Sequence, residues 1–261
     1  MKYMYETHLH TSEASACGYS RGRDYVKRYQ DLGYAGIIVT DHFFGGNTAV
    51  PRKLPWRERI NLFCRGYEDA REAGDKAGFS VFFGWEEHFD GDEYLIYGLD
   101  KQWLLNHPEA GNWTRKEQFD AVHAAGGCVV QAHPFRDRDY ISSIRLSTGC
   151  VDAVEGYNAA NRPENDILAV RYATQLGLPV TAGSDIHSTH QWPDEQMMGV
   201  VFDKPLNSIH DYVKAIREKL PFHVKVPSDR GNWQEGIRIH LPVEIRDESD
   251  RRSDKNVWDL L

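Results

Sequence analysis

The chain has 261 residues, of which 41% are hydrophobic and 27% are charged, and it contains seven tryptophans. A disordered chain is excluded, because this composition provides enough apolar surface to bury on folding. The formal net charge of -8 disfavours long nucleic acids as partners, since these bind proteins through many lysine and arginine contacts to phosphate. The length fits a single domain with a large buried core.

No segment of the sequence predicts a membrane span or a secretory signal. Nowhere does the chain approach the roughly 18 to 20 consecutive apolar residues of a span, and the opening MKYMYETHLH lacks the apolar core of a signal peptide. The four cysteines form no CxxC pair, which fits a reducing compartment. We therefore expect a cytoplasmic protein that does not bind membranes; its oligomeric state stays open.

Short apolar runs of strand length alternate with longer segments of helical period, which is typical of parallel βα units. Strands are predicted at residues 3–7, 36–40, 79–83, 128–132, 151–157 and 179–182, with added strands at 94–98 and 198–202. Helices are predicted at residues 24–32, 57–77, 115–125, 164–176 and 208–219. This pattern indicates an α/β domain over residues 1–226, followed by a polar extension over 227–261 that is not a separate domain.

Residues that commonly bind metals follow one predicted strand after another. His8 and His10 are two apart, so both side chains point to the same side of an extended strand, and Asp185 and His187 share this spacing. The remaining residues of this kind are Asp41, His42, Glu86, His88 and His133. Because the carboxyl ends of parallel barrel strands open onto one face, we expect these side chains to meet around metal ions.

Two of these positions carry further local information. The carboxylate of Glu86 has two oxygens and can therefore bridge two cations, which a neutral histidine cannot do. His133 precedes Pro134, whose ring disfavours a helical conformation for the histidine and favours an extended one. We expect Glu86 to lie at the centre of the site and His133 to leave its strand in an extended conformation.

Five short motifs occur in a fixed order along residues 5–205: H-x-H at 8–10, T-D-H at 40–42, G-x-E at 84–86, A-H-P at 132–134 and G-S-D-x-H at 183–187. Together they resemble the PHP (polymerase and histidinol phosphatase) superfamily. The resemblance implies a distorted, TIM-like (β/α)7 barrel with a metal site at the C-terminal ends of its strands. It also implies two or three divalent ions, which would be zinc, manganese or iron, and hydrolysis of phosphate esters.

The resemblance also implies a division of the ligands among the ions. The first ion would take His8, His10, Glu86 and Asp185, the second Glu86 and His133, and the third His42 and His187, with Asp41 orienting a neighbouring ligand. The chain departs from the family pattern at two places. Cys17 occupies the position of a further third-ion ligand, and the segment YLIYG at 94–98 lacks a histidine that would bind the second ion. His88 is the expected replacement for that histidine.

The resemblance predicts a phosphoesterase, either a phosphatase or a phosphodiesterase, that acts on a small phosphorylated metabolite or nucleotide. Two ions about 3.5 to 4 Å apart would activate a bridging water for in-line attack. We assign Glu86, Asp185 and His187 to catalysis. The substrate would contact Arg136, which follows His133 by three residues, together with Asn158 and Arg162 in the loop after the strand at 151–157.

Two other functions stay open. A metal-dependent hydrolase of carbon–nitrogen bonds would share the barrel and the metals, but such enzymes commonly use a carbamylated lysine, and no lysine ends a predicted strand. A metal-binding domain with weakened catalysis, kept for a structural or partner-binding role, would explain the departures at Cys17 and near Leu95. A nuclease for oligonucleotides is disfavoured by the acidic charge and the lack of a basic stripe.

Overall fold

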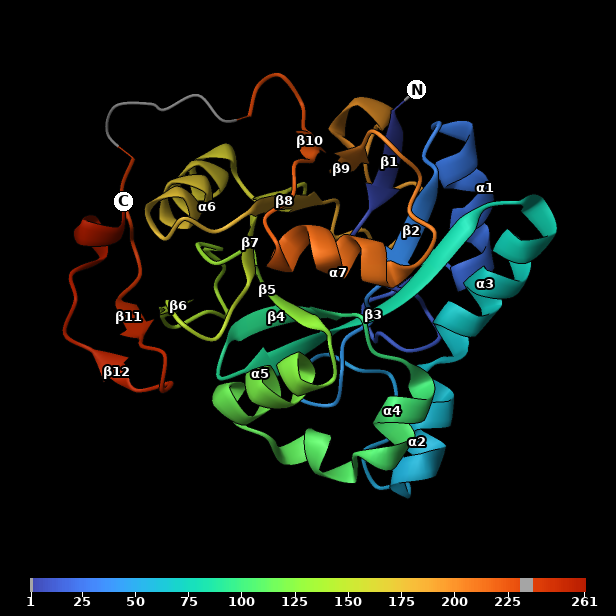
Figure 1. Ribbon diagram of the computed structural model, residues 1–261, viewed down its shortest axis with the longest axis horizontal. Coiled ribbons are helices and arrows are strands. Elements are labelled where there is room, and N and C mark those ends of the chain that lie inside the picture. The colour runs from blue at the N-terminus through green and yellow to red at the C-terminus, as the bar shows by residue number, and fades with distance from the viewer. Residues whose placement is uncertain (1, 231–236) are drawn as a thin grey trace.

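A computed structural model describes residues 2–230 and 237–261 of the chain (Figure 1). Its main sheet has nine strands in the order β10 (His223–Lys225), β9 (Gly199–Phe202), β1 (Tyr3–Glu6), β2 (Gly36–Val39), β3 (Ser80–Phe89), β4 (Asp92–Tyr97), β5 (Cys128–Ala132), β7 (Ala153–Asn158) and β8 (Val180–Gly183). The sheet curls into a nearly closed barrel, so the predicted α/β class and distorted barrel are confirmed. Two more strands enter the sheet than the seven expected.

The strand directions bring six carboxyl ends to one rim. β1, β2 and β3 are parallel, and so are β5, β7 and β8. β4 runs antiparallel between β3 and β5, so both parallel groups point the same way. β9 and β10 add an antiparallel pair beside β1. The side chains that follow these six strands therefore share one end of the barrel.

The barrel closes where β8, the last strand in the order, comes next to the end of β1. Leu9 and Ile186, just beyond these strands, form a parallel bridge, and the His10 amide donates to the Ile186 carbonyl over 2.9 Å. The fully buried carboxylate of Glu6 strengthens this junction, because one of its oxygens accepts from the amides of Thr7, His8 and Ser184 at 2.8 to 2.9 Å.

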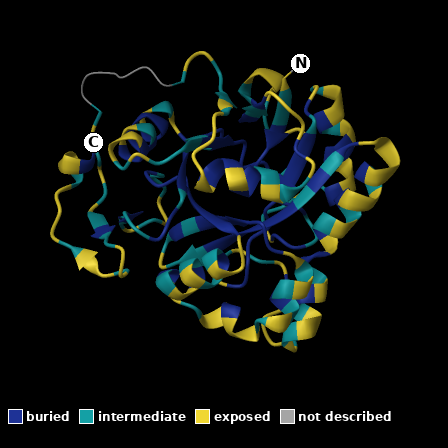
Figure 2. Cartoon of the chain, in the orientation of Figure 1, coloured by how far each residue is buried: buried dark blue, intermediate teal, exposed yellow. Residues whose placement is uncertain are grey.

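Helices cover the outside of the barrel, and Figure 2 shows buried strands inside and exposed outer helix faces. They are α1 (Gly22–Asp31), α2 (Trp56–Phe63), α3 (Arg65–Ala77), α4 (Lys101–Asn106), α5 (Arg115–Ala124), α6 (Pro163–Gln175) and α7 (Ile209–Arg217), with short 3₁₀ helices η1 (Pro108–Asn112), η2 (Asp194–Gln196) and η3 (Val257–Leu260). The prediction of one helix over 57–77 is wrong, because the chain divides at Cys64 into α2 and α3. Gly66 then lets α3 approach the first motif, since a β-carbon there would lie 1.9 Å from Thr11 Oγ1.

The C-terminal extension packs against the barrel domain along one edge (Figure 1). Its strand β11 (Val243–Arg246) pairs in parallel with β6 (Ile144–Ser147) and antiparallel with β12 (Arg252–Ser253). Ile245 and Leu260 are buried in a cluster that includes Leu168 and Tyr172 of α6. The sequence analysis missed β6, β10, β11, β12 and α4, all of which are short.

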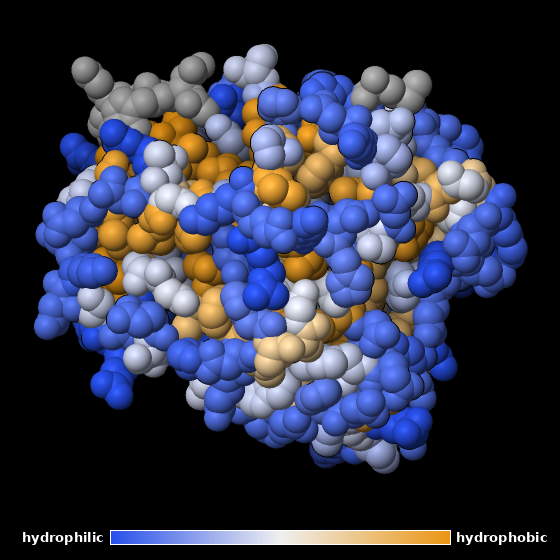
Figure 3. Space-filling view, viewed as in Figure 1, coloured by the Kyte–Doolittle hydropathy of each residue, from blue (hydrophilic) through white to orange (hydrophobic). Residues whose placement is uncertain are grey.

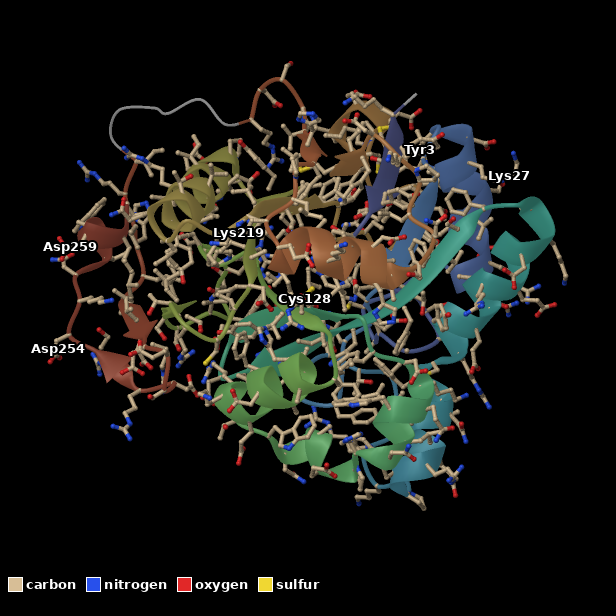
Figure 4. The ribbon with its side chains drawn as sticks, in the orientation of Figure 1. Tyr3, Lys27, Cys128, Lys219, Asp254 and Asp259 are labelled. Atoms are coloured by element: carbon tan, nitrogen blue, oxygen red, sulfur yellow. The ribbon has the colours of Figure 1, made fainter. Side chains whose placement is uncertain are left out.

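The surface is largely polar, as the 27% of charged residues leads one to expect. On the face in Figure 3, hydrophilic residues surround smaller hydrophobic areas. Figure 4 shows Cys128 inside the barrel, whereas Lys27, Asp254 and Asp259 lie at the periphery. Within the described residues, no helix combines the length and the apolar character needed to cross a membrane.

Replacement of Glu6 by alanine tests the closure of the barrel. The Glu6→Ala variant leaves three buried amide donors without their acceptor, and each such loss costs about 1 to 3 kcal/mol. We expect the free energy of unfolding in urea to fall by about 3 kcal/mol or more. The control Glu72→Ala removes an exposed pair with Lys76 and should change stability by less than about 0.5 kcal/mol. Equal effects of the two changes would show that Glu6 does not stabilise the junction.

Candidate metal centre

The first motif places two buried histidines directly beyond β1. Their Nε2 atoms lie 3.1 Å apart, and neither side chain is accessible to solvent. Asp185 Oδ1, which follows β8, lies 3.6 Å from His8 Nε2 and 3.3 Å from His10 Nε2. The three ligand atoms therefore face a common point, as the i, i+2 spacing of each motif predicts.

Glu86 occupies the centre of the rim, and its two oxygens face different pairs of histidines. Oε1 lies 3.2 Å from Nε2 of both His8 and His133. Oε2 lies 3.5 Å from His10 Nε2 and 2.8 Å from His42 Nδ1. Since the residue is only 1% exposed, water does not solvate the carboxylate, and the surrounding histidines determine its environment.

Four groups of ligand atoms, each with all members within 4.8 Å of one another, can hold an ion. They are His8, His10 and Asp185; His8, Glu86 and His133; His42, Glu86 and Glu93; and His10, His42 and His187. The chemistry of the set fits zinc, manganese or iron, which all accept imidazole and carboxylate ligands. His42 Nδ1 and Glu86 Oε2 are buried 2.8 Å apart, and neither atom has a hydrogen-bond partner besides the other among the described residues. A cation between them would satisfy both.

The buried groups shift one another's protonation. Burial alone would raise the pKa of Glu86, but the neighbouring His8 and His42 outweigh burial and hold the pKa well below its ordinary value. Burial would likewise lower the pKa of His8, but Glu155, Asp185 and Glu86 raise it well above the usual range. The pKa of His10 falls well below that range, because burial and then the adjacent His42 and His187 disfavour its charged form.

Two further carboxylates orient the ligands from behind. Glu155 of β7 is fully buried, and its Oε1 lies 2.9 Å from His8 Nδ1, which leaves Nε2 of that ring facing the site. Asp41 accepts from the backbone and hydroxyl of Thr11 and from the hydroxyl of Ser15, whose oxygen lies 3.2 Å from His10 Nδ1. Such contacts fix the ring orientation of metal-binding histidines.

Two ligand positions have a strained backbone. His133 has φ +28° and Asp185 has φ +48°, a region that residues other than glycine rarely adopt. The expectation of an extended His133 is therefore wrong, although Pro134 follows it. With this backbone conformation, the side chains of His133 and Asp185 point toward Glu86 and His8. Backbone strain of this kind is concentrated at functional sites.

The remaining predicted residues fall in different places. Cys17 interacts with both His42 and His187, and hydrogen bonds to them outweigh burial and lower its pKa to about 7. His88 lies two residues beyond Glu86 on β3 and belongs to none of the four groups formed by the described residues. Arg162 precedes α6 and lines a separate pocket with Asp137 and Glu164.

Arg136 and Asn158, expected to contact the substrate, bind protein groups around Asp185. Arg136 donates to Asp185 Oδ2 and, at 3.0 Å each, to the side-chain oxygens of Asn158 and Asn161. The Asn158 amide donates to Glu155 Oε2 over 2.8 Å. A contact between either residue and a substrate stays a prediction.

Sequence reasoning missed Glu93, Glu155 and Ser15. Glu93 of β4 pairs across the ladder with His88 and therefore shares the face that carries Glu86. Its oxygens lie 3.4 Å from His133 Nε2 and 3.8 Å from His42 Nδ1. The Asp90–Gly91 pair is a hairpin signal that could have indicated this register. No comparable sequence signal distinguishes Glu155 or Ser15.

Known structures share this fold at low sequence identity. A two-domain protein from Bacteroides vulgatus that contains a predicted PHP-like metal-dependent phosphoesterase matches with a TM-score of 0.64 and 16% identity, over 87% of this chain and 65% of that protein. A protein from Bifidobacterium adolescentis that is predicted to be a metal-dependent phosphoesterase matches with a TM-score of 0.50 and 18% identity, over 72% and 88% of the two chains. The PHP resemblance is thus confirmed for the fold.

An amidohydrolase from Chromobacterium violaceum, with bound sulfate and no metal, also matches with a TM-score of 0.50 and 14% identity, over 86% of this chain and 98% of that one. No protein-family model matches the chain. A search of curated proteins likewise finds no match. At identities of 14 to 18%, these likenesses show the fold alone.

Separate replacements of Glu93 and His88 show which of the two residues takes the place of the histidine that the family pattern has near Leu95 as a ligand of the second ion. Glu93 approaches His133 and His42, so the Glu93→Ala variant should bind one ion at least tenfold more weakly, the lower end of the effect of removing a ligand or its partner. His88→Ala should leave metal content unchanged. Elemental analysis after dialysis against limiting manganese measures both. The opposite pattern would identify His88 as the ligand.

Proposed function

We propose that the chain is a metal-dependent phosphoesterase of the PHP type that hydrolyses a small phosphorylated metabolite or nucleotide. One observation carries this proposal: the buried Glu86 carboxylate lies among four histidines, with Oε1 3.2 Å from Nε2 of both His8 and His133 and Oε2 within 3.5 Å of His10 Nε2 and 2.8 Å of His42 Nδ1. A carboxylate in this arrangement can bridge two cations, and neighbouring pairs of divalent ions are typical of enzymes that cleave phosphate esters.

We propose three ion positions from the distances among the ligand atoms. The first ion would take His8, His10, Asp185 and Glu86, the second His133, Glu86 and Glu93, and the third His42, His187 and Cys17. Glu93 takes the role that the sequence analysis gave to His88. Two ions require only the first two sets, and the third depends on the thiol.

The residues of the chain would each perform a limited task in hydrolysis. When bound, divalent ions supply an activated water and neutralise charge on the phosphoryl oxygens. Glu86 and Asp185 provide negative charge that holds the ions close together. His187, with 20% of its side chain exposed, is the most accessible of the five histidines, so it would be the first of them to meet a substrate that enters from solvent. Arg136 would keep Asp185 in its strained conformation.

Cleavage of a carbon–nitrogen bond is the second candidate, because an amidohydrolase shares the fold. However, the residues that directly follow the six parallel strands at the rim include no lysine, which such enzymes commonly carry as a metal ligand. The third reading, a site with weakened catalysis, loses support because Glu93 and Cys17 supply donors at both departures from the family pattern. A phosphoester substrate is therefore the function that the site supports best.

Metal analysis combined with a substrate panel tests the proposed activity. The purified protein should contain two or three divalent ions and hydrolyse members of a panel of phosphomonoesters and phosphodiesters but not matched amides. Glu86→Ala should lose metal and phosphoester hydrolysis together, since it removes the carboxylate that lies within 3.5 Å of four histidines. The exposed change Glu72→Ala provides the control. Retention of both properties by Glu86→Ala would refute the bridging role, and hydrolysis of amides alone would favour the second candidate.

Replacement of Cys17 tests the third ion position. Cys17→Ala should lower metal content by at most one ion per chain, because the histidines that the thiol contacts, His42 and His187, both belong to the third position. Cys17→Asp, which restores an anionic ligand, should recover that ion. A loss of more than one ion would contradict the ligand scheme, and no loss would show that the thiol is not a ligand.

A further inference from the structure

Arg230, near the start of the C-terminal extension, reaches into the barrel domain. Its side chain is 7% exposed, and its Nη1 donates to Asp166 Oδ2 over 2.6 Å. The same nitrogen donates to the carbonyls of Asn158 and Asn161 over 3.2 and 3.0 Å, while Nη2 approaches the Ala159 carbonyl at 3.4 Å. One guanidinium thus binds three carbonyls of the turn 158–161.

The partner of Arg230 contacts the same turn. Asp166 of α6 is fully buried, and its Oδ1 accepts from the Asn158 backbone amide at 3.3 Å and from Asn161 Nδ2 at 3.2 Å. Burial raises the pKa of Asp166 to about 7, although the charge of Arg230 opposes this rise. Within this ion pair, Asp166 accepts hydrogen bonds from the donors of the turn, and Arg230 donates to its carbonyls.

The other side of the turn contacts the metal centre. The side-chain oxygens of Asn158 and Asn161 accept from Nη2 and Nε of Arg136, each over 3.0 Å. Arg136 Nη2 also donates to Asp185 Oδ2. Hydrogen bonds thus run without interruption from Arg230 through the turn and Arg136 to Asp185, which lies beside His8 and His10.

We propose that Arg230 is a positioning residue for the metal centre: it fixes the turn 158–161, which orients Arg136 and, through it, the carboxylate of Asp185. The C-terminal extension is then part of the functional unit. This inference uses the proposed function only in taking Asp185 as a ligand. Arg230 itself lies behind the turn and contacts neither Asp185 nor the five histidines of the site in the described residues.

An arginine is required for this role by its shape. Nη1 of Arg230 donates to Asp166 and to the carbonyls of Asn158 and Asn161, and Nη2 extends the contact to the Ala159 carbonyl. A lysine ammonium is a single compact donor that can pair with Asp166 but lacks the second nitrogen and the fixed plane of the guanidinium. A lysine at position 230 should therefore preserve the ion pair and lose part of the fixation of the turn.

Metal titration of two Arg230 variants tests the proposal. Arg230→Ala should weaken one bound manganese ion roughly tenfold, as loss of hydrogen bonds behind a ligand commonly does, and leave the other ions unchanged. Arg230→Lys should weaken the same ion less than Arg230→Ala does. If the alanine variant does not fold, the lysine variant is compared with the wild-type protein instead. Glu244→Gln, which breaks the pair with Arg246 in the same extension, is the control and should leave every affinity unchanged.

A second measurement separates this proposal from the proposed function. In metal-free protein, the Nε–H of Arg136 donates to Asn161 and should give a slowly exchanging NMR signal, which Arg230→Ala shifts or broadens and Glu244→Gln does not. Wild-type protein that binds no manganese would refute the proposed function, and the Arg136 signal would still test the positioning. An unchanged Arg136 signal in a folded Arg230 variant would overturn the proposal, even if the variant binds manganese more weakly.

Discussion

The centre of this structure depends on a carboxylate that is removed from water and surrounded by imidazoles. Glu86 is 1% exposed, and a charge at such a position is costly unless positive charge lies close to it. His8 and His42 provide that charge in the metal-free site, which explains why the pKa of Glu86 is low and those of the two histidines are high. Divalent ions can replace these protons, so the same geometry that stabilises the carboxylate prepares it to bind metal.

The barrel provides the precision that this arrangement requires. The candidate ligands of β1, β3, β5 and β8 meet because these parallel strands end at one rim, and the contacts of Glu6 join the ends of β1 and β8, which precede His8 and Asp185. One oxygen of Glu6 accepts hydrogen bonds from the backbone amides of His8 and of Ser184, the residue before Asp185. A loose junction at this point would separate two ligands of the same proposed ion, so stability and binding geometry depend on the same contacts.

The sequence predicted the parts of the site that local rules determine. The i, i+2 spacing and the position after a strand identify His8, His10 and Asp185, because strand direction fixes where such side chains point. Glu93 was missed because its position depends on the register of β3 against β4. The conformation of His133 was predicted incorrectly, since tertiary contacts of the rim impose φ +28° against the preference before proline. The short strands β6 and β11 pair over a separation of about 100 residues, which no local pattern reports.

Three buried carboxylates, Glu6, Asp166 and Glu86, differ in the groups that surround their oxygens. Glu6 is satisfied by backbone amides and the Tyr29 hydroxyl, and Asp166 by Arg230, Asn161 and the Asn158 amide. Glu86 differs, because its Oε2 is buried with only histidine nitrogens beside it, His42 Nδ1 at 2.8 Å and His10 Nε2 at 3.5 Å, and accepts from no backbone amide or hydroxyl in the described residues. Complete hydrogen bonding makes the first two acids fixed supports for the rim. Glu86, with histidines on both oxygens, retains the capacity to bind cations, and this combination of burial and imidazole neighbours supports its proposed bridging role.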